Sequence, residues 1–171
     1  EYISAKKNIF SKNSKSINLI SLDDVYSNKI FNDNTIKNKI SFSLKNTNAD
    51  IYYKEGCIVD SYFYKNSKFK LSNISLDLTN NYNLQNILAA YIVSRFLNIQ
   101  IKFFSESVKN FKGLPYRSAV IFKSKRMLII NNSKATNISS AIASLENKKN
   151  IYLILGGIAK EDGFEQINNF R

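Results

Sequence analysis

The spacing of the apolar residues changes at Asn83, and this change constrains the fold more than any other feature of the chain. Between residues 39 and 76, the short stretches "ISFSL", "DIYY", "CIVDSYFY" and "FKLSNISL" alternate roughly between apolar and polar side chains. This period is typical of half-buried strands, so a small antiparallel sheet or meander is predicted there. After Asn83 the apolar residues recur with the period of one helical face: Leu84, Ile87, Leu88, Tyr91 and Ile92.

The two ends of the chain add further elements. A short helix, "YISAKKNIF", and a strand, "INLISL", are predicted before Asp23. The strands "SAVIF" and "RMLII" are predicted in the last third, followed by a helix with an apolar face from Ile138 to Leu145 and by the apolar run "IYLIL". Continuous apolar runs that alternate with helices are typical of a parallel sheet buried on both faces, so the predicted fold class is α/β. The only proline, Pro115, marks the best candidate for a domain boundary.

Composition excludes several classes of protein. With one cysteine, Cys57, no internal disulfide is possible, which fits a reducing cytoplasm. Histidine is absent, which excludes histidine bases and histidine metal ligands within these residues. No apolar run reaches the roughly 18 residues of a membrane-spanning helix, so a soluble chain with no membrane partner is expected. The chain begins at Glu1 with no signal-peptide pattern, and it is therefore expected to be a fragment.

The net charge of +12 has two interpretations. The first is a module that binds nucleic acid or an anionic membrane. The second is a biased composition rich in Lys, Asn and Ile, with no such partner. Only four of the 25 basic residues are arginine, and the lysines are dispersed, whereas proteins that read nucleic acids tend to cluster their charge and to use arginine. The second interpretation is favoured, and the first is kept as an alternative.

The polar turn "NNSKATN", Asn131 to Asn137, lies between the predicted strand "RMLII" and the helix after it. Ligands gather at the carboxyl ends of parallel strands, and the free N–H groups of a helix N-terminus favour an anion. Lys134 would add a positive charge and the hydroxyls of Ser133 and Thr136 would add donors, so a phosphate or carboxylate is the natural ligand. The alternative is that Thr136 or Asn137 caps the helix, and the two interpretations are compatible.

Four other residues are candidates on weaker patterns. Arg117, in "GLPYR", suits a bidentate contact with a phosphate, or else is a surface arginine beside a linker. Lys160 follows the glycine pair of "ILGGIAK", where the backbone allows close approach, or else is simply solvated. Asn83 and Asn86 are three residues apart at a helix start and hence share a face. Asn83 suits a helix N-cap, and Asn86 suits a contact with a base or a ribose.

Four stretches together resemble motifs of the Mur ligases in order and spacing: "NYNLQNILAA", "FKGLPYR", "INNSKATN" and "IYLILGGIAK". Within that family, "SKATN" after a strand together with "GLP-R" resembles the D-glutamate-adding member. The resemblance implies that residues 1–111 are the back part of a central ATPase domain. It implies that residues 112–171 are the first strand–helix–strand part of a Rossmann-like C-terminal domain, which binds D-glutamate.

The resemblance also implies a reaction. Such enzymes join UDP-N-acetylmuramoyl-L-alanine to D-glutamate with ATP and Mg²⁺, through an acyl phosphate, in cytoplasmic peptidoglycan synthesis, and a monomer is expected. The chain has no phosphate loop of the form G-x-x-G-K-[ST], so the Mg²⁺ ligands are expected upstream and this segment alone is expected to be inactive. The alternatives are a sister Mur or folylpolyglutamate-type ligase, a degenerate non-catalytic relative, and the basic nucleic-acid-binding module.

Matching this chain to the family's motifs implies roles residue by residue. The residues implied to bind the nucleotide are Asn83, Asn86, Arg117, Asn132 and Lys134. Arg117 is implied to reach the ATP phosphates and Lys134 to lie beside the nucleotide, which makes both candidates for catalysis. Thr136 and Lys160 are implied to hold the D-glutamate carboxylates. No metal ligand is implied within the chain.

The chain departs from the family's pattern at four positions. Tyr82 and Tyr116 stand where the family usually has histidine, and Asn80 stands in place of a glycine. Asn132 replaces an acidic residue that contacts the ribose, and an amide makes such a hydrogen bond without charge assistance. Reduced nucleotide affinity is one expectation, and compensation elsewhere in the chain is the other.

Overall fold

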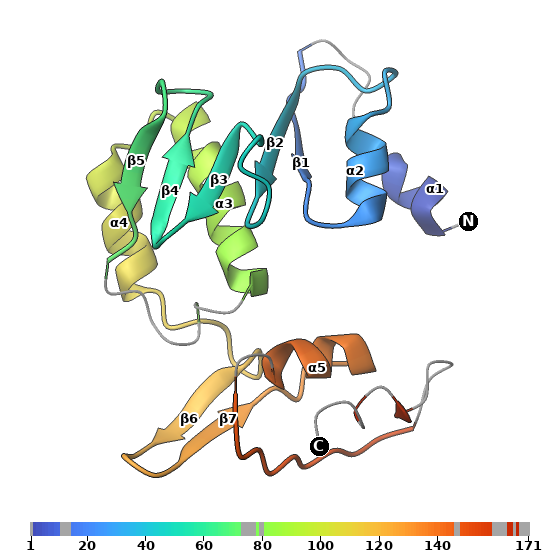
Figure 1. The fold of residues 1–171 in the computed structure, drawn as a ribbon, viewed down its shortest axis with the longest axis vertical. Coiled ribbons are helices and arrows are strands. Elements are labelled where there is room, and N and C mark those ends of the chain that lie inside the picture. The colour runs from blue at the N-terminus through green and yellow to red at the C-terminus, as the bar shows by residue number, and fades with distance from the viewer. Residues whose placement is uncertain are drawn as a thin grey trace. The chain divides into compact units, whose positions relative to one another are not determined.

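The computed structural model describes residues 2–10, 15–72, 78, 81–145, 148–158, 164–165 and 167. The chain folds into two compact units, which Figure 1 shows as ribbons. The first unit contains the described residues up to Ser72 together with Asn81–Asn110, and the second contains Leu78 and the described residues from Phe111 onward. None of the described helices is long and apolar enough to cross a membrane.

The first unit is an α/β structure around a mixed sheet with the strand order β1-β2-β3-β4-β5. Its elements are α1 (Tyr2–Lys7), β1 (Asn18–Ser21), α2 (Val25–Phe31), β2 (Lys39–Ser43), β3 (Ile51–Lys54), β4 (Cys57–Asp60), β5 (Ser67–Lys70), α3 (Asn81–Phe96) and α4 (Ile101–Asn110). β1, β2 and β3 run parallel, whereas β3, β4 and β5 run antiparallel. The predicted fold class is confirmed, with the mixed sheet as its main part.

The antiparallel meander predicted from the alternating stretches is present in β3, β4 and β5. A two-residue turn joins β3 to β4, since Lys54 pairs with Cys57. The turn residues Glu55 and Gly56 have φ values of 51° and 79°. Positive φ at both central residues is the conformation that matches the right-handed twist of a hairpin, and glycine adopts it without strain.

The prediction was wrong for "ISFSL", because β2 pairs parallel with both of its neighbours. The residues between β1 and β2 include α2, which supplies the helical crossover that a parallel pair needs. Between β2 and β3 there is no helix. The short connection suffices because only Phe42 with Ile51 and Ser43 with Tyr52 are paired, so β3 begins beside the end of β2 and continues past it.

Helix α3 packs its predicted apolar face against β2 and β3. Its buried residues include all five that the helical period indicated: Leu84, Ile87, Leu88, Tyr91 and Ile92. Figure 1 shows α3 and α4 on the same face of the β3–β5 strands. Between these layers the rings of Phe69, Tyr91 and Phe104 contact one another, with centroids 5.5 to 6.5 Å apart. This core fixes α3 against the sheet, and α3 carries two of the candidate residues.

The second unit contains β6 (Ala119–Lys123), β7 (Leu128–Asn131) and α5 (Ile138–Leu145), as predicted. Two details differ from the prediction. First, β6 and β7 are antiparallel, because Ser124 N–H donates to the Met127 carbonyl oxygen at 2.8 Å and closes a tight reversal. Second, "IYLIL" forms no strand: among the described residues it pairs with none, and Tyr152 and Ile154 are 99% and 94% exposed. The parallel strand–helix–strand arrangement is therefore not formed here.

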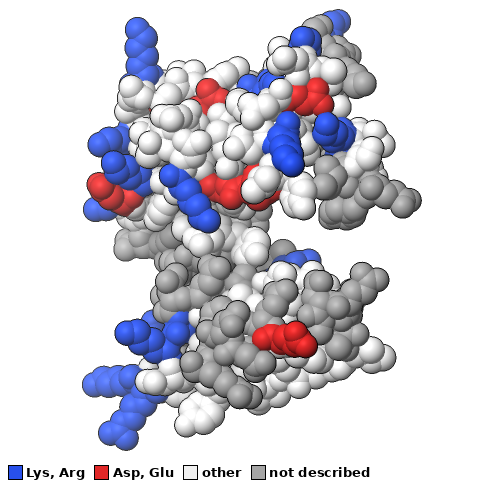
Figure 2. All heavy atoms as spheres, turned by 45° about the vertical axis from the view of Figure 1, so that its right-hand side comes forward, with Lys and Arg blue, Asp and Glu red and all other residues white. Residues whose placement is uncertain are grey.

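The charged side chains are spread over the face shown in Figure 2. Lys and Arg side chains project at several separate places, and Asp and Glu side chains lie among them. On this face the basic side chains that are drawn are thus not collected in one stripe.

Candidate functional site

One candidate site lies within the first unit at the carboxyl ends of β1 and β2, which are parallel and therefore end at the same edge of the sheet. Asp23 follows β1, and its carboxylate accepts hydrogen bonds from four groups. The backbone N–H of Leu44 donates at 3.0 Å to the nearer oxygen and that of Lys45 at 3.3 Å. The Ser43 hydroxyl donates as well, and Gln85 Nε2 of α3 donates at 2.6 Å.

These hydrogen bonds decide the protonation state of Asp23. Burial of the carboxyl group opposes ionisation, but the bonds from Ser43 and Gln85 and from the Leu44 and Lys45 backbone outweigh burial and hold the pKa of Asp23 below its ordinary value. Asp23 is therefore an anion whose oxygens are already occupied by donors. The sequence indicates only that a strand ends before Asp23. It does not indicate this hydrogen-bonded site, because the partners of Asp23 are distant in sequence.

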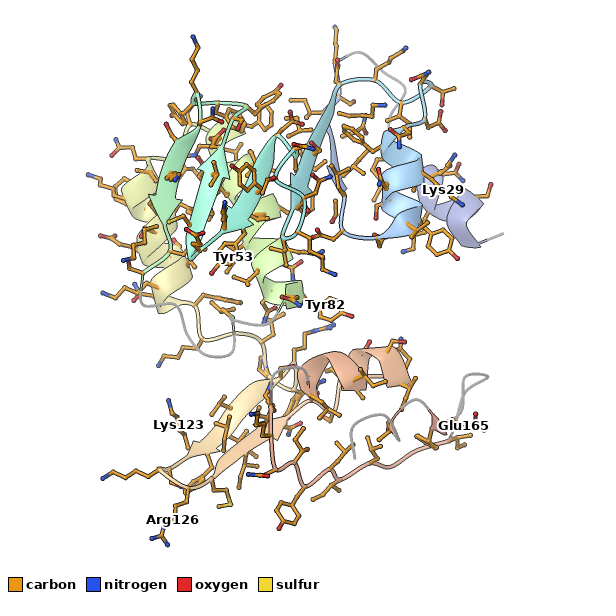
Figure 3. All side chains as sticks on the ribbon, in the orientation of Figure 1. Lys29, Tyr53, Tyr82, Lys123, Arg126 and Glu165 are labelled. Carbon is orange, nitrogen blue, oxygen red and sulfur yellow. The ribbon has the colours of Figure 1, made fainter. Side chains whose placement is uncertain are left out.

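The first two turns of α3 carry Asn83 and Asn86, three residues apart and hence on one face. Asn86 is exposed and Asn83 is half-buried. The helix already begins at Asn81, so the interpretation of Asn83 as the N-cap was wrong. Tyr82, the residue that replaces histidine, is 56% exposed in the first of these turns (Figure 3).

A separate candidate site, within the second unit, is the turn between β7 and α5. Asn137 caps α5, since its Oδ1 accepts from the Ser140 backbone N–H at 2.8 Å, and the capping prediction is confirmed for this residue. At the other end of the turn, Asn131 Oδ1 accepts from Ser133 N–H at 3.0 Å. The turn therefore holds its shape by its own hydrogen bonds.

The structure brings this turn together with the "GLPYR" motif. Lys134 N–H donates to the Tyr116 carbonyl oxygen at 3.0 Å, and Ser118 N–H donates to Asn132 Oδ1 at 3.0 Å. The "GLPYR" backbone is sharply folded to make these bonds, with positive φ at Tyr116 and Ser118. The two motifs that carry Arg117 and Lys134 thus form one local structure within the second unit.

The side chains at this place differ in what they contact. Arg117, Lys134 and Thr136 are exposed. The Asn132 amide is engaged on both sides, because its Nδ2 donates to the Ser140 carbonyl oxygen at 3.3 Å. Lys160 and Asn80 lie outside the described residues. Among the candidate residues, Asn132 therefore has an evident structural role, which the sequence did not indicate.

Metal binding finds no support in the described part of the chain. It contains no group of three or more His, Cys, Asp and Glu residues that fits a metal ion. Asp23 does not fit either, because its oxygens accept from protein donors.

Comparison with known proteins identifies similar chains. Residues 1–94 match the Mur ligase middle domain. The UDP-N-acetylmuramoylalanine–D-glutamate ligase of Rickettsia bellii is 35% identical over 99% of this chain. The enzyme of the same name from Francisella tularensis subsp. mediasiatica is 37% identical over 66% of it. The chain spans 38% of the length of the first relative and 28% of the second.

Two solved structures share the fold. A pseudomurein peptide ligase type C from Methanothermus fervidus superposes with a TM-score of 0.60 at 18% identity, over 86% of this chain and 37% of that one. A UDP-N-acetylmuramoyl-L-alanyl-D-glutamate–2,6-diaminopimelate ligase superposes with a TM-score of 0.55 at 21% identity, over 75% of this chain and 28% of that one. At these identities the likeness is one of fold.

Proposed function

Because this chain belongs to the Mur ligase family, we propose that it is part of a ligase that adds D-glutamate to UDP-N-acetylmuramoyl-L-alanine with ATP, in peptidoglycan synthesis. The identity to a D-glutamate ligase over 99% of the chain supports this member of the family over its sisters. Residues 1–111 would belong to the central domain and residues 112–171 to the C-terminal domain. The whole protein would act in the cytoplasm as a monomer, and this segment alone would be inactive.

The proposed reaction has two steps. The carboxylate of UDP-N-acetylmuramoyl-L-alanine attacks the γ-phosphorus of ATP, which forms an acyl phosphate and releases ADP. The amine of D-glutamate then attacks the acyl carbon, loses a proton, and expels inorganic phosphate as the amide forms. Both steps concentrate negative charge on phosphate oxygens, so cations held in place lower the barrier. Mg²⁺ would supply further charge neutralisation when bound to groups outside the described residues.

In this proposal each candidate residue has one role. Asn83 and Asn86 bind the nucleotide through their amides, and Asn132 lies next to its ribose. Arg117 and Lys134 offset the phosphate charge. Thr136 and Lys160 bind the carboxylates of D-glutamate.

The observation that carries the proposal is the pair of hydrogen bonds that join the "GLPYR" motif to the turn. Lys134 N–H to the Tyr116 carbonyl and Ser118 N–H to Asn132 Oδ1 hold the backbones of Arg117 and Lys134 in one local structure. Two exposed cationic residues carried by one local backbone structure suit a polyphosphate ligand.

The test uses the complete gene product and a set of acceptor amino acids. We expect ATP-dependent ligation with D-glutamate, and little with L-glutamate, L-lysine or diaminopimelate. Preference for another amino acid would assign the protein to a sister ligase. Tight ATP binding without any ligation would instead favour a non-catalytic relative, and in either case the proposal fails.

A further inference from the structure

We propose that Asp23 is a positioning residue for nucleotide binding, which acts through Gln85 to hold the first two turns of α3 in place. The inference rests on the proposed function, since it takes Asn83 and Asn86 of those turns as nucleotide ligands. It assigns a role to two residues for which the sequence predicted none.

Asp23 is held rigidly by the turn that follows β2. Ser43 is fully buried, and its hydroxyl donates to Asp23. The same oxygen accepts from the backbone N–H groups of Lys45 at 3.0 Å and Asn46 at 2.8 Å. With the bonds from Leu44 and Lys45 N–H to Asp23 itself, the carboxylate is a fixed part of the sheet edge rather than a mobile surface group.

Gln85 links this fixed carboxylate to α3. Its Nε2 lies 2.6 Å from Asp23 Oδ2, and the side chain is half-buried. A hydrogen bond to a charged acceptor is short and stronger than one between neutral groups. The same Nε2 lies 3.5 Å from Ser21 Oγ at the end of β1. Gln85 therefore contacts the strand end that Asp23 follows.

The position of Gln85 explains why this bond matters to Asn83 and Asn86. Leu84, Ile87 and Leu88 are buried and pack α3 against the sheet. Apolar contacts are not directional, so they permit the start of α3 to rotate about the helix axis. Gln85 stands between the two asparagines in sequence and adds a directional bond on the flank of the helix. Rotation of the first two turns would displace both amides together, because they share one face.

The donors and acceptors of this pair can be exchanged, which gives a selective test. Gln85→Glu places two carboxylates face to face and breaks the bond. Asp23→Asn in that background restores it, since the new amide donates to the new carboxylate while its oxygen still accepts from Ser43 and the backbone. Asp23→Asn alone is expected to be mild, because Gln85 can turn its amide and accept the hydrogen bond.

The experiment measures ATP binding and steady-state kinetics of the complete gene product. We expect Gln85→Glu to weaken ATP binding and to raise the KM for ATP about tenfold, a change of about 1.4 kcal/mol. The KM for D-glutamate should stay within about twofold. The double variant should recover ATP binding to within about twofold of the wild type. Gln100→Glu is the matched control, because Gln100 is exposed just before α4, and it should change neither constant.

The outcomes separate the inference from the proposed function. If the wild type binds ATP but does not use D-glutamate, the proposed function fails, and ATP binding by Gln85→Glu still decides the inference. If Asn83→Ala weakens ATP binding and Gln85→Glu does not, or if the double variant is no better than Gln85→Glu, the inference is overturned. If Gln85→Glu does not fold, Gln85→Met removes the donor without adding charge, and unchanged ATP binding in that variant overturns the inference equally.

Discussion

Lys134 and Tyr116 are joined through their backbones, with Lys134 N–H donating to the Tyr116 carbonyl oxygen at 3.0 Å. This bond connects two motifs that are separated by β6 and β7 in the sequence. Arg117 directly follows Tyr116 in the sequence. The bond therefore places Arg117 and the exposed Lys134 in the same local structure. Five predictions test this arrangement and the fold around it.

Arg117→Ala is expected to lower kcat/KM for ATP about a hundredfold, which corresponds to about 2.7 kcal/mol of lost transition-state stabilisation. The melting temperature should not change, because the Arg117 side chain is exposed. Arg126→Ala is the matched control, since Arg126 is also exposed and lies at the turn of the β6–β7 hairpin (Figure 3). Equal losses of activity in the two variants would show that net charge, and not position, matters.

Asn132→Asp is expected to lower the free energy of unfolding by about 1 to 2 kcal/mol. The carboxylate can still accept a hydrogen bond from Ser118 N–H. It cannot donate to the Ser140 carbonyl oxygen, so two acceptor oxygens would lie about 3.3 Å apart where Asn132 Nδ2 now donates. We therefore do not expect the acidic residue typical of the family to strengthen ATP binding in this chain. Urea unfolding of the two proteins, with an ATP titration, measures both effects.

Asn137→Asp serves as the control for that change. Asn137 uses only its acceptor, toward Ser140 N–H, and a carboxylate at a helix N-terminus is at least as good a cap. Its free energy of unfolding should stay within about 0.5 kcal/mol of the wild type. A stable Asn132→Asp variant, or an Asn137→Asp variant that is equally destabilised, would contradict the assigned contacts.

Tyr91→Phe is expected to lower the free energy of unfolding by about 1 to 3 kcal/mol. The Tyr91 hydroxyl donates at 2.7 Å to Asp60, which is only 1% exposed and would keep just the Tyr62 and Phe63 N–H donors. Tyr82→Phe is the control, since Tyr82 is 56% exposed and its hydroxyl should matter little. Comparable stability of the two variants would argue against the buried bond.

The same pair predicts a dependence on pH. Burial, and then the bond to Asp60, raises the pKa of Tyr91 well above its ordinary value near 10. The contribution of the Tyr91 hydroxyl to the free energy of unfolding is thus complete below about pH 10, and it is lost as the pH rises through the raised pKa. The difference in the free energy of unfolding between wild type and Tyr91→Phe should be constant up to about pH 9 and decrease above about pH 10. A difference that increases at alkaline pH would contradict the raised pKa.

Gly56→Ala is expected to destabilise the β3–β4 hairpin by about 1 kcal/mol. No atom lies within 4 Å of an added Cβ, so the cost comes only from the φ of 79°. Gly156→Ala is the control, because that site is equally open and its φ is not in the left-handed region. Equal effects of the two substitutions on thermal unfolding would mean that the turn conformation is not the cause.

Local patterns in the sequence predicted the elements well. The apolar period placed the buried face of α3, and alternation placed β3 and β4, because each pattern repeats within a few residues. The stretch "FKLSNISL" overlaps β5 only at Phe69 and Lys70, so β5 begins two residues earlier than predicted. The Asn137 cap was also among the two that the sequence proposed, since a cap contacts a group three residues away. In contrast, α2 was missed, although Asp24 marks its start by accepting from Tyr26 and Ser27 N–H at 2.9 Å.

Contacts between distant residues could not be predicted in this way. The parallel pairing of β2 depends on a crossover helix and on register, neither of which alternation encodes. The same holds for Asp23 with Gln85, and for Asn132 with Ser118 and Ser140. The structural role of each of these residues follows only from the partner that the fold brings to it.

The most direct test of the central claim follows an oxygen atom. The complete gene product is given ATP, D-glutamate and UDP-N-acetylmuramoyl-L-alanine labelled with ¹⁸O in its free carboxylate, and product and phosphate are analysed by mass spectrometry. If the reaction passes through an acyl phosphate, we expect a D-glutamyl amide together with inorganic phosphate that carries one ¹⁸O atom, because the carboxylate oxygen bonded to phosphorus leaves with it. Unlabelled phosphate would rule out the acyl phosphate, and no incorporation of D-glutamate would rule out the proposed ligase.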